Sequence, residues 1–342
     1  MAKAKVSIND IAASLNISKT TVSFILNGKA QEKRISEKLV KKVLRKVEEL
    51  GYQPNQFAKS LRTGKTNIIG LMVEDISNPF YASIAKQIED KAFLNDYKII
   101  YCSTENNKDR AKEFLTMFTN LGVDGCIIAP TMGIEQEIEN LLEMGMDVVL
   151  FDRKYGDVST DVVMVDNQGG VSNAVEHLLS RGYRKIAMVA LALDKPERED
   201  RIIGYVNAMN KNGLEPHYFA LPFKPNSHEY VKDIKEILEK ENDFDAMVFG
   251  TNYLGIGGLE AVTDMGLRIP EDIAMVCFDD HDLFRIHKPN ITVVAQPIEQ
   301  IAQEIMDILL ERMGKKEKRS ENKLINLSTN LITRNSSAKK LN

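Results

Sequence analysis

Residues 7–26, SINDIAASLNISKTTVSFIL, bring together hydroxyl, amide and amine side chains that could hydrogen-bond to DNA. Ser7 and Asp10 form an S-x-x-D helix-start signal, in which the Ser7 hydroxyl can accept from a first-turn amide. The turn at 16–18 interrupts the helical pattern, and Ser18 can cap a second helix. The segment therefore predicts two short helices joined by a three-residue turn.

Apolar residues at helical spacing give both predicted helices an inward face. These residues are Ile8, Ile11, Ala12 and Leu15 in the first helix, and Val22, Ile25 and Leu26 in the second. Lys19, Thr20, Ser23 and Phe24 then point outward. A helix that exposes short polar side chains and a lysine near its N-terminus suits the major groove of DNA. An ordinary helical hairpin is the alternative interpretation.

Charge is distributed unevenly along the 342 residues. Residues 1–65 hold 14 Lys and Arg against 5 Asp and Glu, a net charge of +9, whereas the whole chain has a net charge of −4. The remaining residues therefore carry about −13. A basic N-terminal segment on an acidic body is typical of a DNA-binding headpiece attached to a domain that does not itself bind polyanions. A merely solvated basic face would not explain why only one end is basic.

The chain resembles the lac and gal repressor family of bacterial transcription regulators over nearly its full length. The matching stretches are VSINDIAASLNISKTTVSFILNGK, ISEKLVKKVLRKVEELGYQPN, NQFAKSLRTGKTNIIGLMVEDISNPF, the R-x-x-G-Y-x-x-A run at 201–208 and the RIPEDIAMVCFDD run at 268–280. The helix-turn-helix, the G-Y-x-P-N turn and the A-x-x-L segment occur in the same order and at the same spacing as in the family. The resemblance implies a homodimeric regulator that binds double-stranded operator DNA.

The length and the cysteine content independently limit the number of domains and the kinds of site that the chain can have. The chain is long enough for a small headpiece and a large two-lobed body. It has neither a signal-peptide pattern nor a run of 18 apolar residues, so we expect a soluble, cytoplasmic protein with no membrane contact. Cys102, Cys126 and Cys277 each lie in a strand-like apolar run, which favours buried free thiols over a metal or redox site. No cofactor or metal is expected.

Short, continuous apolar runs alternate with amphipathic helix-length segments after residue 66. The candidate strands are 68–73, 98–102, 125–129, 147–151, 162–165, 185–191, 246–250 and 273–278. Strands of this kind are buried on both faces, so eight or more of them predict an α/β body with two doubly wound parallel sheets. The sequence thus predicts an all-α helix-turn-helix headpiece joined to such a body.

The resemblance implies that this body has the periplasmic-binding-protein arrangement, in which the chain crosses three times between two lobes. The expected divisions are a headpiece at 1–53, a hinge helix and linker at 54–65, an N-lobe at 66–165 plus 295–325, a C-lobe at 166–294 plus 326–334, and a polar, disordered tail at 335–342.

The segment 53–65, QPNQFAKSLRTGK, could form a helix of fewer than two turns or remain a plain linker. So short a helix is unstable alone in water. Asn55 can cap such a helix. By resemblance, Ala58 permits close approach to the partner's helix, and Leu61 inserts into the minor groove and kinks the duplex. We therefore expect a hinge helix that is ordered on DNA.

The resemblance also assigns roles within the second helix of the headpiece. Lys19 and Thr20 match the principal specificity positions of the family and are expected to read bases. Ser18, Thr21 and Asn27 are expected to bind phosphates and fix the register. Phe24 departs from the arginine of several members, so a guanine contact at that position is replaced by packing against a thymine methyl or the backbone.

Polar residues at strand ends and in loops form the candidate effector site. They are Phe80, Asp152, Arg201, Asn252 and Asp279. Taken singly, a strand-end Asp is often a turn former, and Arg201 could make a surface ion pair. Together they supply donors, acceptors and an aromatic face suited to the hydroxyls of a sugar, and they match the family's ligand contacts. Asn226 departs from the aromatic residue of several sugar-binding members, and Phe223 is a possible substitute.

The leading hypothesis is a homodimeric repressor that binds a palindromic operator and is released by a small sugar or sugar derivative. One alternative is a regulator whose corepressor, a small molecule or a phosphoprotein, strengthens DNA binding. The stretch VEDISNPFYASIAKQIED resembles members with a phosphoprotein corepressor. A sugar-binding module without gene control fits the body but leaves the basic headpiece unexplained. An enzyme is disfavoured because no Walker loop, G-x-S-x-G or metal motif follows a strand.

Overall fold

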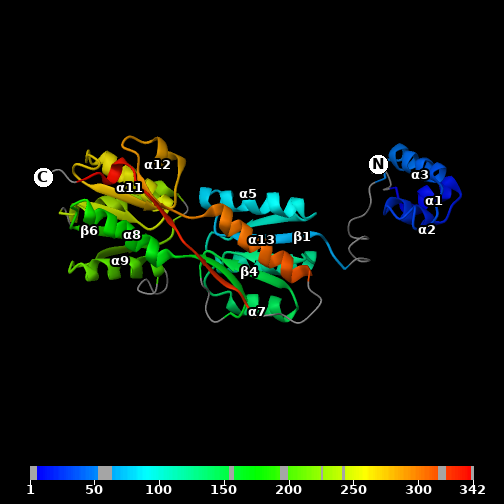
Figure 1. The fold of residues 1–342 in the computed structure, drawn as a ribbon, viewed down its shortest axis with the longest axis horizontal. Coiled ribbons are helices and arrows are strands. Elements are labelled where there is room, and N and C mark those ends of the chain that lie inside the picture. Colours follow the sequence, from blue (N-terminus) through cyan, green and yellow to red (C-terminus); the bar gives the residue numbers. More distant parts are fainter. Residues whose placement is uncertain are drawn as a thin grey trace. The chain divides into compact units, whose positions relative to one another are not determined.

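The computed structural model describes residues 6–52, 64–153, 158–192, 199–224, 226–240, 243–314 and 321–339. Two compact units divide the chain, one spanning Met1–Thr66 and the other Asn67–Asn342. We call them the headpiece and the body. Figure 1 shows the helices of the headpiece and the helices and strands of the body.

Three helices build the headpiece: α1 (Ile8–Leu15), α2 (Lys19–Leu26) and α3 (Glu37–Glu49). Their core is formed by the fully buried side chains of Ile11, Val22 and Val43, with Ala12 and Ile25 beside them. The apolar spacing in the sequence therefore identified the inward faces of both α1 and α2. The three-residue turn between these helices is also confirmed, with Asn16 in the left-handed conformation at φ 51°.

Side-chain hydrogen bonds fix where the first two headpiece helices begin. The Ser18 Oγ accepts from the Thr21 amide at 3.0 Å, as expected for an N-cap. At the start of α1, both the Ser7 amide and the Ser7 hydroxyl donate to the Asp10 carboxylate, each at 2.8 Å. These hydrogen bonds lower the pKa of Asp10. The capping box that the S-x-x-D signal predicts is therefore present, and the Ser7 hydroxyl also donates to the Asp10 carboxylate.

The first lobe of the body is a six-stranded sheet covered on both faces, with strand order β11-β5-β4-β3-β1-β2, all parallel. Helices α5 and α13 pack on one face, and α6 and α7 on the other. The elements are β1 (Ile68–Val73), α5 (Pro79–Leu94), β2 (Lys98–Ser103), α6 (Lys108–Leu121), β3 (Gly125–Ile128), α7 (Glu135–Glu143), β4 (Asp147–Phe151), β5 (Asp161–Val165), α13 (Ile298–Gly314) and β11 (Leu324–Leu327).

The second lobe repeats this design with strand order β12-β10-β9-β8-β6-β7, in which only β12 is antiparallel to its neighbour. Helices α8 and α9 cover one face, and α10, α11 and α12 the other. The elements are α8 (Asn167–Ser180), β6 (Ile186–Leu191), α9 (Asp200–Lys211), β7 (His217–Leu221), η2 (Ser227–Tyr230), α10 (Val231–Lys240), β8 (Ala246–Phe249), α11 (Asn252–Asp264), β9 (Ala274–Phe278), α12 (Asp282–Ile286), β10 (Thr292–Ala295), β12 (Asn330–Ile332) and η3 (Asn335–Ser337).

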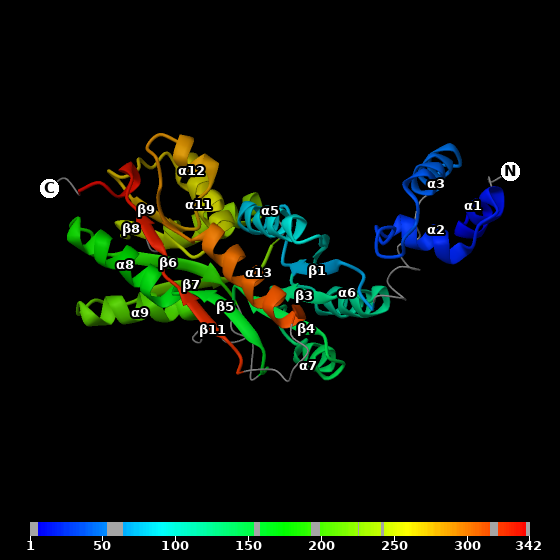
Figure 2. The ribbon, with the colours of Figure 1, turned by 45° about the vertical axis from the view of Figure 1, so that its right-hand side comes forward.

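The chain passes between the lobes three times, from β5 to α8, from β10 to α13 and from β11 to β12. In Figure 2, α13 lies against the first lobe, and the red C-terminal segment that carries β11 runs from this lobe to the second. The fold is therefore α/β, with two doubly wound sheets that are parallel apart from the β12 edge strand. The third crossing lies between Leu327 and Asn330, slightly later than the expected boundary at 325.

The described part of the C-terminal segment packs into the second lobe, which differs from the disorder expected there; residues 340–342 lie outside the described residues. Residues 335–337 form η3, and the side chains of Ser336 and Ser337 are fully buried. Ser336 Oγ donates to the carbonyl of Met275 at 2.6 Å, and the Ser337 Oγ hydrogen-bonds to Thr292 Oγ1 at 2.7 Å. These two buried serines therefore satisfy polar groups of the second lobe.

All three cysteines are buried in the body as free thiols, as predicted. Burial raises the pKa of Cys126 to about 12 and also raises that of Cys277, so neither is a reactive thiolate at neutral pH. Among the described residues, no helix combines the length and apolar character needed to cross a membrane.

Candidate DNA and effector sites

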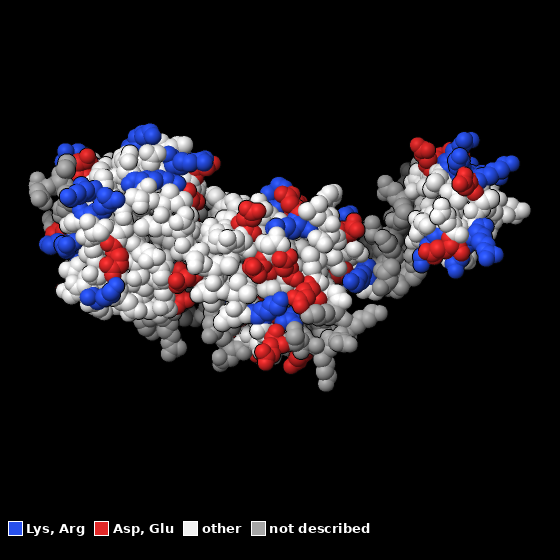
Figure 3. Space-filling view, in the orientation of Figure 1, with Lys and Arg blue, Asp and Glu red and all other residues white. Residues whose placement is uncertain are grey.

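The headpiece exposes the residues expected to read DNA. Lys19 and Thr20 are exposed in the first turn of α2, and Thr21 is partly exposed beside them. The Ser18 and Thr21 hydroxyls hydrogen-bond to each other at 2.8 Å. Ser18 and Thr21 therefore define the helix start, while Lys19 and Thr20 keep their polar groups available for a ligand. Figure 3 shows Lys and Arg side chains projecting from the headpiece surface.

Two further expected DNA contacts are partly engaged within the headpiece. The Phe24 ring is half-buried, and the Lys33 ammonium lies 5.2 Å from its centroid in a cation–π contact. The exposed Asn27 donates from Nδ2 to the carbonyl of Ser23 at 2.5 Å. Phe24 therefore presents an aromatic surface with a cation beside it, where several family members have an arginine.

The hinge predictions fall on residues that the structure does not describe. Asn55, Ala58 and Leu61 lie outside the described residues.

Arg201 lies at the start of α9, and its guanidinium contacts three groups of its own lobe. Its Nε donates to Asn167 Oδ1 at 2.8 Å, and its Nη1 donates to the carbonyl of Gly250 at 2.5 Å. The guanidinium stacks over the Phe278 ring, with Cζ 3.8 Å from the centroid. This fixed orientation excludes the surface ion pair considered as an alternative, because its partners are an amide, a backbone carbonyl and an aromatic face.

Asp279 follows β9 and is buried beside Arg201, with φ at 70°. Gln296 Nε2 donates to Asp279 Oδ1 at 2.6 Å. Burial raises the pKa of Asp279, although the charge of Arg201, the Gln296 hydrogen bond and a hydrogen bond from the Asn252 backbone amide oppose that shift. The negative charge of Asp152 adds to the increase. Asp279, Arg201, Asn252 and Asp152 therefore influence one another in one buried region.

Asp152 occupies the corresponding position after β4 of the other lobe, again with a positive φ of 75°. Its Oδ2 accepts from the Tyr81 hydroxyl at 2.8 Å. The neighbouring Arg153 donates to Glu74 Oε2 at 3.0 Å and contacts Asp152 Oδ2 at 3.4 Å. Asp152 and Asp279 thus both hold their carboxylates at a strand end in the left-handed region, which non-glycine residues adopt infrequently.

The lobes contact each other through Asn252, which is 2% exposed. Its Nδ2 donates to Oδ1 of Asn78, the N-cap residue of α5, at 2.8 Å. Burial, followed by the charge of Glu74, raises the pKa of the adjacent Tyr253 well above its ordinary value. Since Glu74 and Asn78 belong to the first lobe, and Asn252 and Tyr253 to the second, the polar site is assembled from both.

The aromatic candidates lie at the edges of this region. Phe80 is 7% exposed and packs edge-on against Tyr81, with centroids 4.9 Å apart. Phe223, the possible substitute for the aromatic residue missing at Asn226, packs edge-on against Tyr253 at 6.2 Å.

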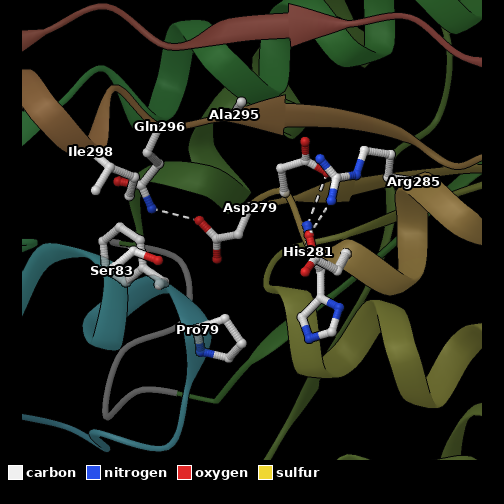
Figure 4. A pocket seen from close by; sticks show the side chains of 11 residues that line it. Pro79, Ser83, Asp279, His281, Arg285, Ala295, Gln296 and Ile298 are labelled. Atoms are coloured by element: carbon white, nitrogen blue, oxygen red, sulfur yellow. Dashed lines mark hydrogen bonds and ion pairs between the residues drawn. The ribbon is translucent and has the colours of Figure 1, made fainter. Parts of the chain in front are cut away.

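A pocket of about 390 Å³ opens where α5, the segment after β9 and the crossing from β10 to α13 meet. Phe80 and Asp279 line it, together with Pro79, Ser83, Asp280, His281, Asp282, Arg285, Ala295, Gln296 and Ile298 (Figure 4). Its volume is in the range that holds a small ligand. Donors and acceptors in such a pocket suit a polyhydroxylated molecule.

Several residues of this region were missed by the sequence analysis. Arg153 and Tyr253 are next to predicted residues, and Asn78 could have been found as a helix cap in the S-N-P turn. Gln296 carried no signal, because it follows a four-residue strand that was not among the predicted strands, and Glu74 was indistinguishable from an ordinary strand-end acid.

A helix-turn-helix unit joined to a two-lobed body with a polar site between its lobes defines a DNA-binding protein controlled by a ligand. Residues 7–55 match the model for bacterial regulatory proteins of the lacI family, and residues 175–337 match a periplasmic binding protein-like domain. The chain belongs to the lacI family of bacterial transcriptional regulators.

Curated relatives match along almost their full length. The chain is 31% identical to the HTH-type transcriptional regulator RegA of Clostridium saccharobutylicum, over 91% of this chain and 93% of the relative. It is 30% identical to catabolite control protein A of Priestia megaterium, with the same coverage. Among solved structures, a LacI family transcriptional regulator from Enterococcus faecium with bound ribose is 29% identical, with a TM-score of 0.70, over 80% of this chain and 99% of the other.

Proposed function

We propose that the protein is a repressor that binds a palindromic operator as a homodimer and releases it when a small sugar or sugar derivative binds between the lobes. The observation that carries this proposal is the group formed by the buried Asp279 and Asn252 and the partly buried Arg201, which meets Asp152 and Asn78 of the other lobe. A ligand that replaces these contacts between the lobes acts directly on their arrangement. The structure of the Enterococcus faecium relative with bound ribose supports a sugar as the ligand class.

In the headpiece, we propose that α2 enters the major groove, where Lys19 and Thr20 contact base edges. Ser18, Thr21 and Asn27 contact phosphates and set the register, and Phe24 packs against a thymine methyl or the sugar-phosphate backbone. The hinge residues Asn55, Ala58 and Leu61 complete the interface in the minor groove. Such a protein acts in the cytoplasm, where the operator lies.

In the body, Arg201 offers donors to ligand hydroxyls, and Asp152 and Asp279 offer acceptors. Asn252 offers both a donor and an acceptor, and Phe80 supports the apolar face of the ring. A ligand shifts DNA binding only if it favours one lobe arrangement over the other. We propose that ligand binding affects DNA binding through the contacts between the lobes, because the Asn78–Asn252 hydrogen bond must change when the lobes move.

The test begins by selecting, from random DNA, fragments that the full-length protein retains. An inverted repeat recovered from the selection supports the dimer, and light scattering measures the number of chains on it. Neutral sugars are then screened for release of the selected fragment. Release identifies an inducer, whereas tighter retention makes the ligand a corepressor and replaces the induction model. A body that binds sugar while the chain retains no specific DNA contradicts the proposed repressor.

A further inference from the structure

Phe24 is an aromatic residue on α2 that the headpiece core does not explain. The apolar cluster of the headpiece takes its α2 residues from Val22, Ile25 and Leu26. Within the described part of the chain, Phe24 is not among the residues packed in that cluster, and its ring is partly exposed. Core packing therefore does not account for this ring.

The position of Phe24 on α2 relates it to a residue that we propose to read DNA. Thr20 and Phe24 are four residues apart, so they lie one turn apart on the same side of the helix. Thr20 is fully accessible at the start of α2. Recognition helices read successive base pairs with residues about one turn apart. Phe24 is therefore placed to meet a base pair near the one that Thr20 contacts.

The loop after α2 folds back and brings a cation to the Phe24 ring. The Lys29 amide donates to the carbonyl of Phe24 at 2.9 Å, and the Lys33 amide donates to the carbonyl of Lys29 at 3.1 Å. The Lys33 ammonium then lies 5.2 Å from the centroid of the ring. Because the Lys33 side chain is exposed, its ammonium can contact the ring and a phosphate at once.

The chemistry of the two side chains divides the work between them. A phenyl ring has no hydrogen-bonding group, so it cannot read the polar edge of a base. Thymine carries a methyl group in the major groove, and contact with an apolar side chain removes that methyl from water. Packing the ring against a phosphate would instead desolvate an anion without replacing its hydrogen bonds. The ammonium of Lys33 is the group that suits the phosphate.

We propose that Phe24 and Lys33 together select a thymine in each half-site of the operator. The Phe24 ring contacts the 5-methyl group of the thymine. Lys33 is a positioning residue, which holds the ring in place by its cation–π contact and binds a neighbouring phosphate. This inference rests on the proposed operator binding, and it names the base that the α2 ring recognises and a residue outside α2 that determines specificity.

Uracil substitution tests the methyl contact, because uracil differs from thymine only in lacking the 5-methyl group. The probe is the inverted repeat recovered by the selection from random DNA, in which each thymine is replaced in turn, in both half-sites. Fluorescence anisotropy measures its affinity for the full-length protein. At one thymine position we expect uracil to weaken binding about fourfold for each half-site, the factor for burying one methyl-sized group. With cytosine at that position, 5-methylcytosine should restore a similar factor.

Variants of Phe24 assign this effect to the ring. Phe24→Ala should bind the thymine and uracil forms of that position equally. Phe24→Leu keeps an apolar side chain, so it should retain part of the preference, and it provides the comparison if Phe24→Ala binds too weakly to measure. A thymine preference that both variants keep in full at every position would overturn the proposal, as would half-sites in which no thymine responds to uracil.

Variants of the loop test the positioning role. Lys33→Met keeps the side-chain length and removes the cation, so we expect the fourfold preference to fall to twofold or less. Lys33→Arg keeps a cation over the ring and should keep the preference. Lys29→Met, at an exposed position of the same loop, is the matched control and should also keep it. An unchanged preference in Lys33→Met would overturn the role of Lys33.

This inference and the proposed function fail differently. Specific binding to an operator whose thymine preference does not depend on Phe24 overturns the inference and leaves the repressor standing. A protein that retains no specific DNA contradicts the proposed function and overturns this inference with it.

Discussion

Replacing Arg201 with Met should destabilise the body strongly, even though Arg201 is a candidate ligand contact. The substitution removes donors to Asn167 and to the Gly250 carbonyl, and it removes the cation stacked on Phe278. Hydrogen bonds from a charged donor contribute about 1.5 to 3 kcal/mol each, and the loss also leaves Asp279 buried beside no cation. Because the contacts form one network, their losses do not add, so we expect a total of about 3 to 5 kcal/mol.

Urea unfolding of the full-length protein measures this loss in the transition of the body, followed separately from that of the headpiece. Lys211→Met is the matched control on the same helix. Lys211 is 75% exposed and pairs with Glu176 at 3.0 Å, so its removal should cost no more than about 1 kcal/mol. If Arg201→Met is no more destabilising than Lys211→Met, the structural role assigned to Arg201 is refuted.

Three other changes test separate parts of the structure. Ser18→Ala should reduce headpiece stability by about 1 kcal/mol in thermal unfolding, since Ser18 caps α2, and an unchanged midpoint would contradict this. The unfolding free energy of Asp279→Asn should shift in favour of the variant, relative to the parent, as pH rises from about 4, because a carboxyl whose pKa is raised in the folded state contributes stability that is lost as it deprotonates. A difference in unfolding free energy that does not change with pH would refute this. Arg312→Met leaves Asp161 buried without its bidentate partner and should cost about 3 to 5 kcal/mol in urea unfolding, whereas a loss below about 1 kcal/mol would show that the pair is dispensable.

The fold was largely predictable because its central strands are continuous apolar runs, which read as strands buried on both faces. The strands that were missed have weaker patterns. Strands β7 and β11 lie at sheet edges and are only partly buried, so their sequences HYFAL and LINL mix polar and apolar residues. Strand β10 is buried but has only four residues and begins with Thr292.

Only those residues of the candidate site that directly follow a strand could be predicted from the sequence. Asp152 and Asp279 follow apolar runs, and the structure places both in the buried region between the lobes. The pairing of Asn78 with Asn252 joins residues 174 positions apart, and no local pattern specifies it. The same holds for Gln296, whose hydrogen bond to Asp279 is a property of the packed crossing rather than of its sequence neighbours.

The central claim is that a ligand in the body controls DNA binding by the headpiece, and calorimetric titration tests it most directly. The sugar found in the release screen is titrated into the full-length protein, alone and with saturating operator. We expect operator to lower the affinity for the sugar by the same factor by which the sugar lowers the affinity for operator, because coupling between binding sites is reciprocal. Equal sugar affinities with and without operator would contradict it.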